Sequence, residues 1–140
     1  MNRLIIFLTM ALVMSVAPFA MALDSAALVG SWQLVESAKD ADGNDCPFVG
    51  KQLKFTADGK MISANMPVPF KYKVNPSEAE TKSAIARKPD LQGMEIMLAM
   101  MGNSSSDWTK APIIYGVQLE GNQFTMKVSG YTPARYKKLK

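Results

Sequence analysis

LVGSWQLV, residues 28–35, is the clearest structural signal in this chain of 140 residues. Its residues alternate in character: Leu28, Gly30, Trp32 and Leu34 share one face of an extended segment, and the residues between them share the other. A period of two over eight residues predicts a β-strand that is buried on one face.

The same alternation recurs along the chain, and tight turns separate its segments. Asp58-Gly59 stands between two alternating runs, which is a strong hairpin signal, and Gly121-Asn122 stands between two more. Short strands that each have one apolar face predict a mainly β fold, and closure into a small antiparallel up-and-down β-barrel would remove the sheet edges. We predict strands over residues 28–35, 52–56, 61–66, 68–74, 113–119, 123–128 and 134–139.

The middle of the chain has a different pattern. Residues 76–89 are polar and irregular, with one weak strand at 81–86. Asp90 is placed to cap a helix over residues 91–101, and Gly102 is placed to end it. This segment is apolar almost all round, so we expect one inserted α-helix that packs against the barrel or a partner. Its apolar side chains at helical spacing are Met94, Met97, Leu98 and Met101.

Residues 1–22 have the three parts of an export signal. Arg3 precedes an uncharged apolar stretch at residues 4–17, and the small residues Ala20 and Ala22 suit a signal-peptidase site. We predict a signal peptide at 1–22 that is cleaved after Ala22, and a single mature domain at 23–140 without an integral membrane span. The predicted location is periplasmic or secreted.

The Gly30-Ser31-Trp32 strand near the start and the Pro133-Ala134-Arg135-Tyr136 segment near the end resemble the lipocalin-like families of the calycin group, especially the short bacterial lipocalin-like domains. The resemblance implies an up-and-down barrel whose last strand packs an Arg over the first-strand Trp, here Arg135 over Trp32. Fatty-acid-binding calycins hold a carboxylate with Arg-x-Tyr on one strand face. Arg135 and Tyr136 are adjacent and so lie on opposite faces, which does not support that mechanism.

The residues that usually carry catalysis are scarce. The chain has no His, and Cys46 is its only cysteine, which excludes an intramolecular disulfide, Ser-His and Cys-His nucleophiles and ordinary zinc sites. We therefore predict no enzyme, no cofactor and no metal site, and we interpret Cys46 as a structural thiol. The acidic run 40–45 lacks the spacing of an EF-hand loop and is interpreted as a polar connection.

The mature domain is mildly basic. Removing residues 1–22 takes away Arg3 and lowers the net charge from +4 to +3. The one basic run, residues 136–140, is interpreted as a solvated terminus in preference to a contact with anionic lipid, glycan or peptidoglycan. We predict no nucleic-acid partner.

The apolar faces of the predicted strands supply a candidate binding site. A lining that is apolar with a few phenolic hydroxyls suits a small hydrophobic or amphipathic ligand, and it equally suits a solid core. We predict an exported, non-catalytic binding protein for such a ligand, with Met94, Met97 and Met101 of the 91–101 segment as a lid. The predicted ligand-binding residues are Phe55, Phe70, Tyr72, Tyr115, Val117, Phe124, Met126, Met94, Met97 and Met101.

Two alternatives remain open from the sequence. In the first, the barrel is solid and the protein is an envelope interaction module that works through its loops or the 91–101 segment. In the second, the methionine cluster binds Cu(I), which prefers sulfur ligands. Methionine also fills irregular apolar seams, and we favour that interpretation.

Overall fold

The structure is a computed structural model that describes residues 23–47, 49–64, 68–101 and 106–139. The predicted signal peptide and its cleavage site lie outside the described residues, as do Met66 and Gly102.

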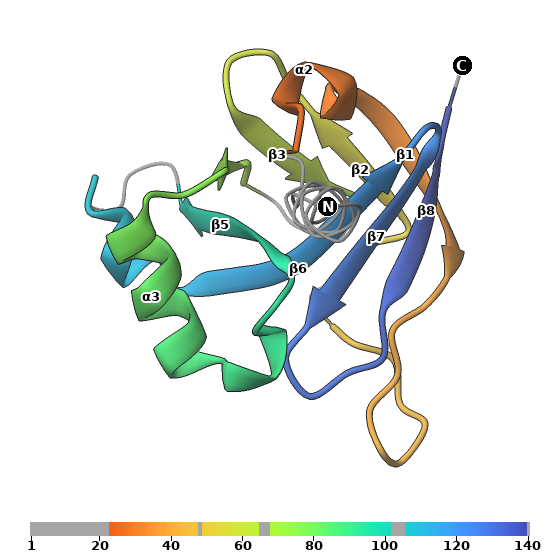
Figure 1. Ribbon diagram of the computed structural model, residues 1–140. Coiled ribbons are helices and arrows are strands. Elements are labelled where there is room, and N and C mark those ends of the chain that lie inside the picture. The colour runs from red at the N-terminus through yellow and green to blue at the C-terminus, as the bar shows by residue number, and fades with distance from the viewer. Residues whose placement is uncertain (1–22, 48, 65–67, 102–105, 140) are drawn as a thin grey trace, which may run out of the picture.

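The chain forms a closed barrel of eight antiparallel strands in sequence order, in which the last strand pairs with the first (Figure 1). This confirms the predicted mainly β, up-and-down barrel with one inserted helix. Every predicted strand outside the middle segment is present in the described residues, with shifts of a few residues at the ends. The strands are β1 (Gly30–Glu36), β2 (Gln52–Phe55), β3 (Lys60–Ser63), β4 (Phe70–Val74), β5 (Glu95–Met101), β6 (Ile113–Glu120), β7 (Gln123–Val128) and β8 (Ala134–Lys138).

The prediction of a helix over residues 91–101 is wrong. Residues 95–101 form β5, which pairs with both β4 and β6, and only Pro89–Leu91 before it makes a 3₁₀ turn, η1. Ile96, Leu98 and Met100 face outward under a helix, while Met97 and Ala99 face the barrel interior. A strand that is buried on both faces reads as a continuous apolar run, which cannot be distinguished from a buried helix by periodicity.

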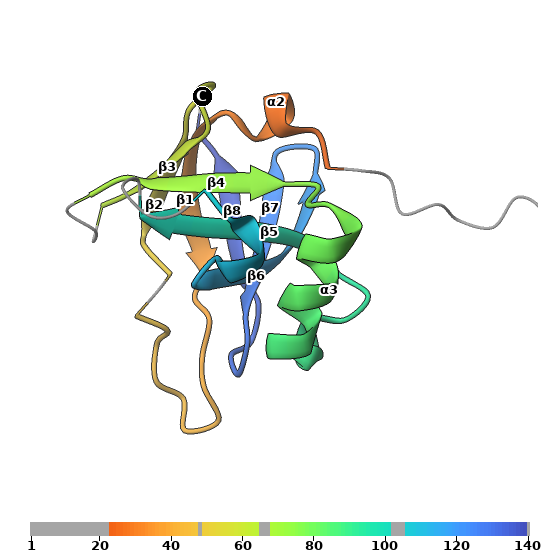
Figure 2. The same cartoon turned by 90° about the vertical axis from the view of Figure 1, so that its left-hand side faces the viewer.

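The inserted helix lies earlier in the chain, at residues expected to be irregular, and the weak strand predicted at 81–86 is wrong because these residues are helical. α3 (Glu78–Arg87) packs on the outside of β5 and β6 (Figure 2). Ser77 begins it with a capping box: the Ser77 side chain accepts from the Glu80 amide, and the Glu80 carboxylate accepts from the Ser77 amide. Two further short elements are α2 (Ser25–Leu28) and a 3₁₀ turn, η2 (Trp108–Lys110).

The centre of the barrel is filled by aromatic side chains. The Phe124 ring lies 5.7 Å from the Trp32 and Phe55 rings and 6.2 Å from the Tyr136 ring, measured between centroids. All four side chains have an exposed fraction of zero. The Tyr136 hydroxyl donates to the Gly50 carbonyl at 2.7 Å, so its polar atom is satisfied inside the core.

The residue that covers Trp32 is not Arg135. Arg135 points outward and forms an ion pair with Glu36 at 2.6 Å, while Lys138 lies directly opposite Trp32 in the strand register. The Lys138 ammonium lies 5.6 Å from the centroid of the Trp32 ring. Strand alternation explains the difference, because Tyr136 and Lys138 share the inner parity of β8 and Arg135 has the outer one.

Among the described residues, no helix has the length and hydropathy that crossing a bilayer requires.

Candidate functional site

One end of the barrel is crossed by residues 23–29, which we term the strap and which include α2 (Figures 1 and 2). The strap and the tip of the long β1–β2 connection lie at opposite ends of the molecule in both views. Leu23 and Leu28 of the strap are buried in the barrel core, with exposed fractions of 7% and 0%. The strap thus closes this end of the interior with two apolar side chains.

Hydrogen bonds hold the strap near both of its ends. The Asn75 side chain accepts from the Leu23 amide at 3.0 Å and donates to the Leu23 carbonyl at 2.7 Å. Asn75 has a φ of 52°, and Asn is one of the few residues that tolerate this left-handed conformation. At the other end, the Trp32 indole donates to the Leu28 carbonyl at 2.8 Å, and the Lys138 ammonium donates to the Ala27 carbonyl at 3.1 Å.

A hollow lies on each side of the strap. The larger, of about 550 Å³, opens between the strap and the β2–β3 turn, and we term it the hairpin-side hollow. The smaller, of about 370 Å³, is the β6-side hollow. Neighbouring strap residues belong to different hollows: Ala26 lines the hairpin-side one and Ala27 lines the other.

The two hollows differ in charge. The residues that line the hairpin-side hollow are uncharged, namely Ser25, Ala26, Val29, Ala57, Gly59, Tyr72 and Val74. The β6-side hollow includes two carboxylates, and its lining is Leu23, Asp24, Ala27, Glu95, Val117, Gln118, Leu119 and Gly121. The hairpin-side hollow is therefore the better match for an uncharged, mostly apolar molecule.

Tyr72 and Ser25 bring hydroxyl groups to the lining of the hairpin-side hollow, and Tyr72 is the buried one of the two. Its hydroxyl donates to the Thr56 carbonyl at 3.4 Å, a long and therefore weak hydrogen bond. Burial, with a further contribution from the Asp58 charge, raises the pKa of the Tyr72 phenol above its usual value. The phenol consequently keeps its proton at neutral pH and can donate to a better-placed acceptor.

Eight of the ten predicted ligand-binding residues share the barrel interior. Tyr72 reaches the hairpin-side hollow and Val117 the β6-side one, while Tyr115 lines a separate hollow of about 220 Å³ together with Ile113, Val128 and other residues. The others belong to the filled core. The eight are Phe55, Phe70, Tyr72, Met97, Tyr115, Val117, Phe124 and Met126.

The predicted methionine cluster is dispersed by the strand. Met97 faces the interior, Met94 packs against the cluster under α3, and Met101 is 42% exposed at the end of β5. The helical face that would have gathered them as a lid or a Cu(I) site is not formed. Within the described residues, no group of three or more His, Cys, Asp or Glu side chains is placed to hold a metal ion.

In the acidic connection 40–45, the first carboxylate, Asp40, forms hydrogen bonds within the connection itself. One oxygen of Asp40 accepts from the amides of Asp42 and Asn44, both at 2.9 Å, which is an Asx-type turn. These hydrogen bonds, chiefly the one from Asn44, lower the pKa of Asp40. Cys46, just beyond it, is buried in the barrel core with an exposed fraction of 3%.

Sequence reasoning missed most of the hairpin-side hollow. Its small residues Ala26, Ala57 and Gly59 come from two separate segments, and no motif joins them. The sequence identified Gly59 as part of a hairpin signal and Tyr72 as a ligand-binding residue, but did not bring them together with the strap.

Fold and site together define a closed eight-stranded antiparallel barrel with a strapped, partly hollow end. Comparison of the chain with protein-family models, with curated proteins and with solved structures gave no match.

Proposed function

We propose that this protein is a non-catalytic binding protein that holds a small, uncharged, mostly apolar molecule in the hairpin-side hollow. One observation carries the proposal: a hollow of about 550 Å³, lined without charge, ends on a protonated phenol whose hydroxyl has only a weak partner. Small-molecule sites are typically about 300–1,000 Å³, apolar, and equipped with a few polar groups that orient the ligand.

The filled centre of the barrel supports a ligand position at the strapped end. Tyr72 lines the hollow, and Phe55 of the filled core packs edge-on against it with ring centroids 5.0 Å apart. The ligand therefore binds at the strapped end and not in a central lumen. The lipocalin-like relationship and export through residues 1–22 remain predictions, and they would place this activity outside the cytoplasm.

The strap supports the proposal because it forms one wall of the hollow before a ligand binds. Hydrogen bonds with the side chains of Asn75 and Trp32 hold the strap in place. A preformed wall lowers the entropy cost of binding, since little of the protein must be ordered when the ligand enters.

Neighbouring strap residues give a matched test. We expect Ala26→Trp to fill the hairpin-side hollow and to weaken binding of the neutral fluorescent probe N-phenyl-1-naphthylamine by at least about tenfold. Ala27→Trp adds the same side chain on the other side of the strap and should leave the affinity within about twofold. Equal affinities of the two variants, or no probe binding by the unmodified protein, would contradict the proposal.

The phenol gives a second, finer test. Tyr72→Phe removes the hydroxyl and keeps the ring. It should weaken binding of a neutral ligand that carries a carbonyl acceptor, such as 2-acetylnaphthalene, by about two- to tenfold, and leave a ligand without an acceptor unaffected. Titrations that show the same change for both ligands would argue against a hydrogen bond from Tyr72.

A further inference from the structure

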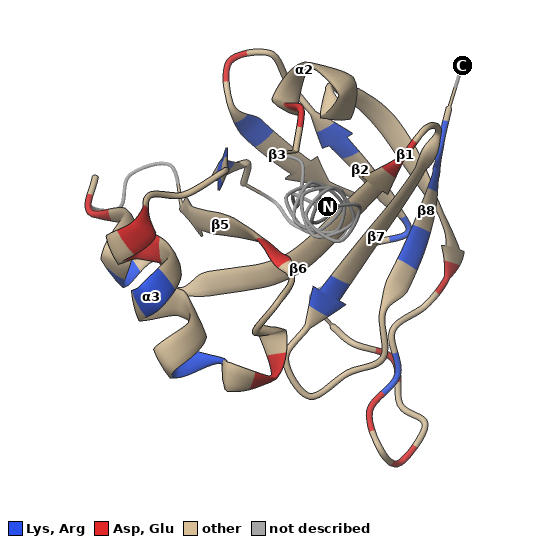
Figure 3. Cartoon of the chain, viewed as in Figure 1, with Lys and Arg blue, Asp and Glu red and all other residues tan. Residues whose placement is uncertain are grey.

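The outer face of β8, β1 and β2 combines lysines with exposed apolar side chains, and we term it the basic face. Lys54 of β2 and Lys137 of β8 point outward. Figure 3 shows blue segments on β2 and β8. Val35 of β1 is 61% exposed and Leu139 is 44% exposed, so two large apolar side chains lie on the same face as the lysines.

Residues 136–139 of the basic run are part of the barrel wall. Lys137 pairs with Gln33 of β1, and Leu139 donates its amide to the Ser31 carbonyl at 2.8 Å. β8 pairs with β1 on one side and with β7 on the other, so the backbone that carries Lys137 is fixed. The charge of Lys137 therefore projects from the barrel wall and not from a loose, solvated tail.

The charge of this face is not balanced within the described residues. Among them, the carboxylates that form ion pairs near this face serve other cations: Glu36 pairs with Arg135, and Asp58 pairs with Lys60. The residues between Lys54 and Lys137 are neutral, and the Gln52 amide donates to Gln33 at 2.9 Å. A partner with negative charge is complementary to this surface.

A hollow on the same face has room for a head group. It has a volume of about 710 Å³, and lysine, amide and apolar side chains alternate around it. Anionic amphiphiles match this combination, because their phosphate or carboxylate suits lysine and their acyl chains suit the apolar side chains. The lining consists of Gln33, Val35, Asn122, Lys137, Lys138 and Leu139.

We propose that the basic face docks on a membrane surface of anionic lipid. Lys54 and Lys137 lie against the head-group phosphates, and Val35 and Leu139 enter the boundary between head groups and acyl chains. The barrel sits on the membrane without crossing it, with α3 on the side away from the bilayer. Exposed apolar side chains among the lysines favour a lipid surface over an acidic protein or polymer, which would need the charge alone.

Vesicle co-sedimentation tests the proposal with the protein of residues 23–140. We expect binding to vesicles of equal parts phosphatidylglycerol and phosphatidylcholine, weakening with added salt, and no binding to phosphatidylcholine alone. One lysine near an anionic surface is worth about fivefold in affinity, so Lys54→Glu with Lys137→Glu should lower the affinity by at least about 25-fold.

A matched double variant distinguishes binding through the basic face from an effect of the total net charge. Lys82→Glu with Lys110→Glu changes the total charge by the same amount on the α3 side, where both lysines are exposed. It should keep the affinity within about threefold. Val35→Ser with Leu139→Ser should weaken binding while preserving its salt dependence.

Four results would overturn the proposal. The first is an equal loss in the two charge-reversed variants, which would reflect net charge only. The second is equal binding to both vesicle types. The third is binding to soluble poly-glutamate without binding to vesicles, which would assign the face to an acidic polymer. The fourth is the absence of any binding to the anionic vesicles. Circular dichroism of each variant confirms that the barrel is intact.

Discussion

The barrel interior and the flank under α3 are both apolar, yet different interactions hold them. In the interior, Phe124 contacts three other aromatic rings. In the flank, α3 brings Ala84 and Ile85 to the cluster, and the remaining side chains come from β5, β6, the 3₁₀ turns and the residues next to them. A helix that buries so little apolar surface needs other attachments to stay on the barrel.

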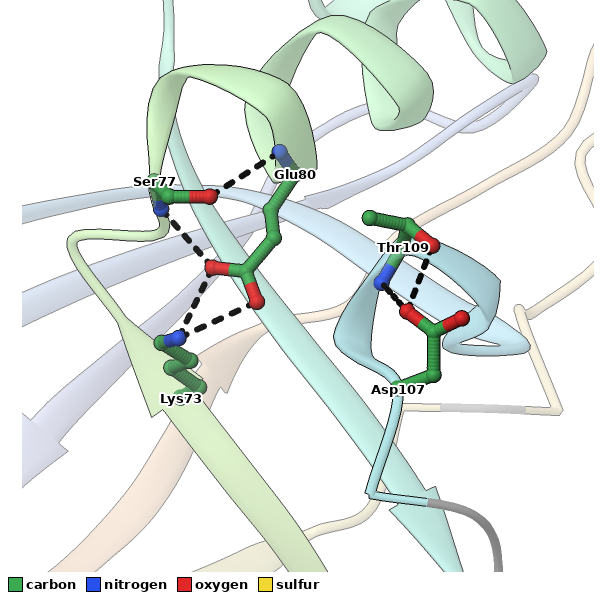
Figure 4. A network of polar contacts seen from close by, with 5 residues as sticks. All are labelled: Lys73, Ser77, Glu80, Asp107 and Thr109. Carbon is green, nitrogen blue, oxygen red and sulfur yellow. Dashed lines mark hydrogen bonds and ion pairs between the residues drawn. The ribbon is translucent and has the colours of Figure 1, made fainter.

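Polar contacts provide those attachments. The Ser83 hydroxyl donates to the Thr109 carbonyl at 2.8 Å, and the Arg87 guanidinium donates to the Ala111 carbonyl at 2.7 Å. At the start of the helix, the Lys73 ammonium lies 2.7 Å from the Glu80 carboxylate (Figure 4). The interior should therefore respond most to loss of volume, and the flank to loss of charge and hydrogen bonds as well.

The largest effect should come from the centre of the interior. Phe124→Ala removes the ring that joins Trp32, Phe55 and Tyr136, and leaves a cavity that these rings cannot fill. We expect the free energy of unfolding to fall by about 3–5 kcal/mol, measured by urea denaturation. Gln123→Ala, at the exposed neighbouring position, serves as the control with a change within about 0.5 kcal/mol. A loss below about 1 kcal/mol would mean that the interior is not a packed core.

A smaller and more local effect should come from the flank. Met100 is 1% exposed and lies in the cluster under α3, on the outer face of β5. Met100→Ala should lower the free energy of unfolding by about 2–3 kcal/mol. It should also increase the rate of amide hydrogen exchange more in α3 than in the strands. The adjacent Met101→Ala, which changes an exposed side chain, should have little effect. Uniformly faster exchange over helix and strands would show that the two regions unfold as one unit.

The same difference explains what could be predicted from the sequence. Strands with one buried face were recognised from their period of two, because the barrel exposes their other face to water. β5 has no exposed face between Ile96 and Met100, so its period is hidden. α3 is polar because only a narrow stripe is buried, and its available signal was the capping box of Ser77 and Glu80.

The site was less predictable than the fold, for a geometric reason. Inward-facing residues such as Phe55 and Tyr72 follow from alternation, but whether an inward face leaves space depends on how facing side chains pack. The hairpin-side hollow exists because the strap crosses the barrel end beside small residues. That path is held by Trp32, four residues from Leu28, and by Asn75, 52 residues from Leu23, and the second contact cannot be read from local sequence.

The smallest predicted effect is the pH dependence of the stability that Glu80 gives to the flank. Glu80 is buried, and hydrogen bonds from Lys73 and then from the Ser77 amide lower the pKa of its carboxyl. Since the folded pKa is below the unfolded one, the unfolded state binds more protons in acid. The stabilisation is therefore present above about pH 4, and is lost as the pH falls through the folded pKa.

Glu80→Gln removes this titration while keeping a side chain of similar shape. At neutral pH it should lower the free energy of unfolding by roughly 0.5–1 kcal/mol, because the exposure of Lys73 weakens the ion pair. In acid, the difference from the unmodified protein should shrink. Glu78→Gln makes the same charge change in the same helical turn at an exposed position, and isolates the contribution of burial and of Lys73. If both variants give the same pH profile of unfolding, the helix dipole and not the Lys73–Glu80 contact governs the flank, and the polar attachment of α3 must lie in Ser83 and Arg87 instead.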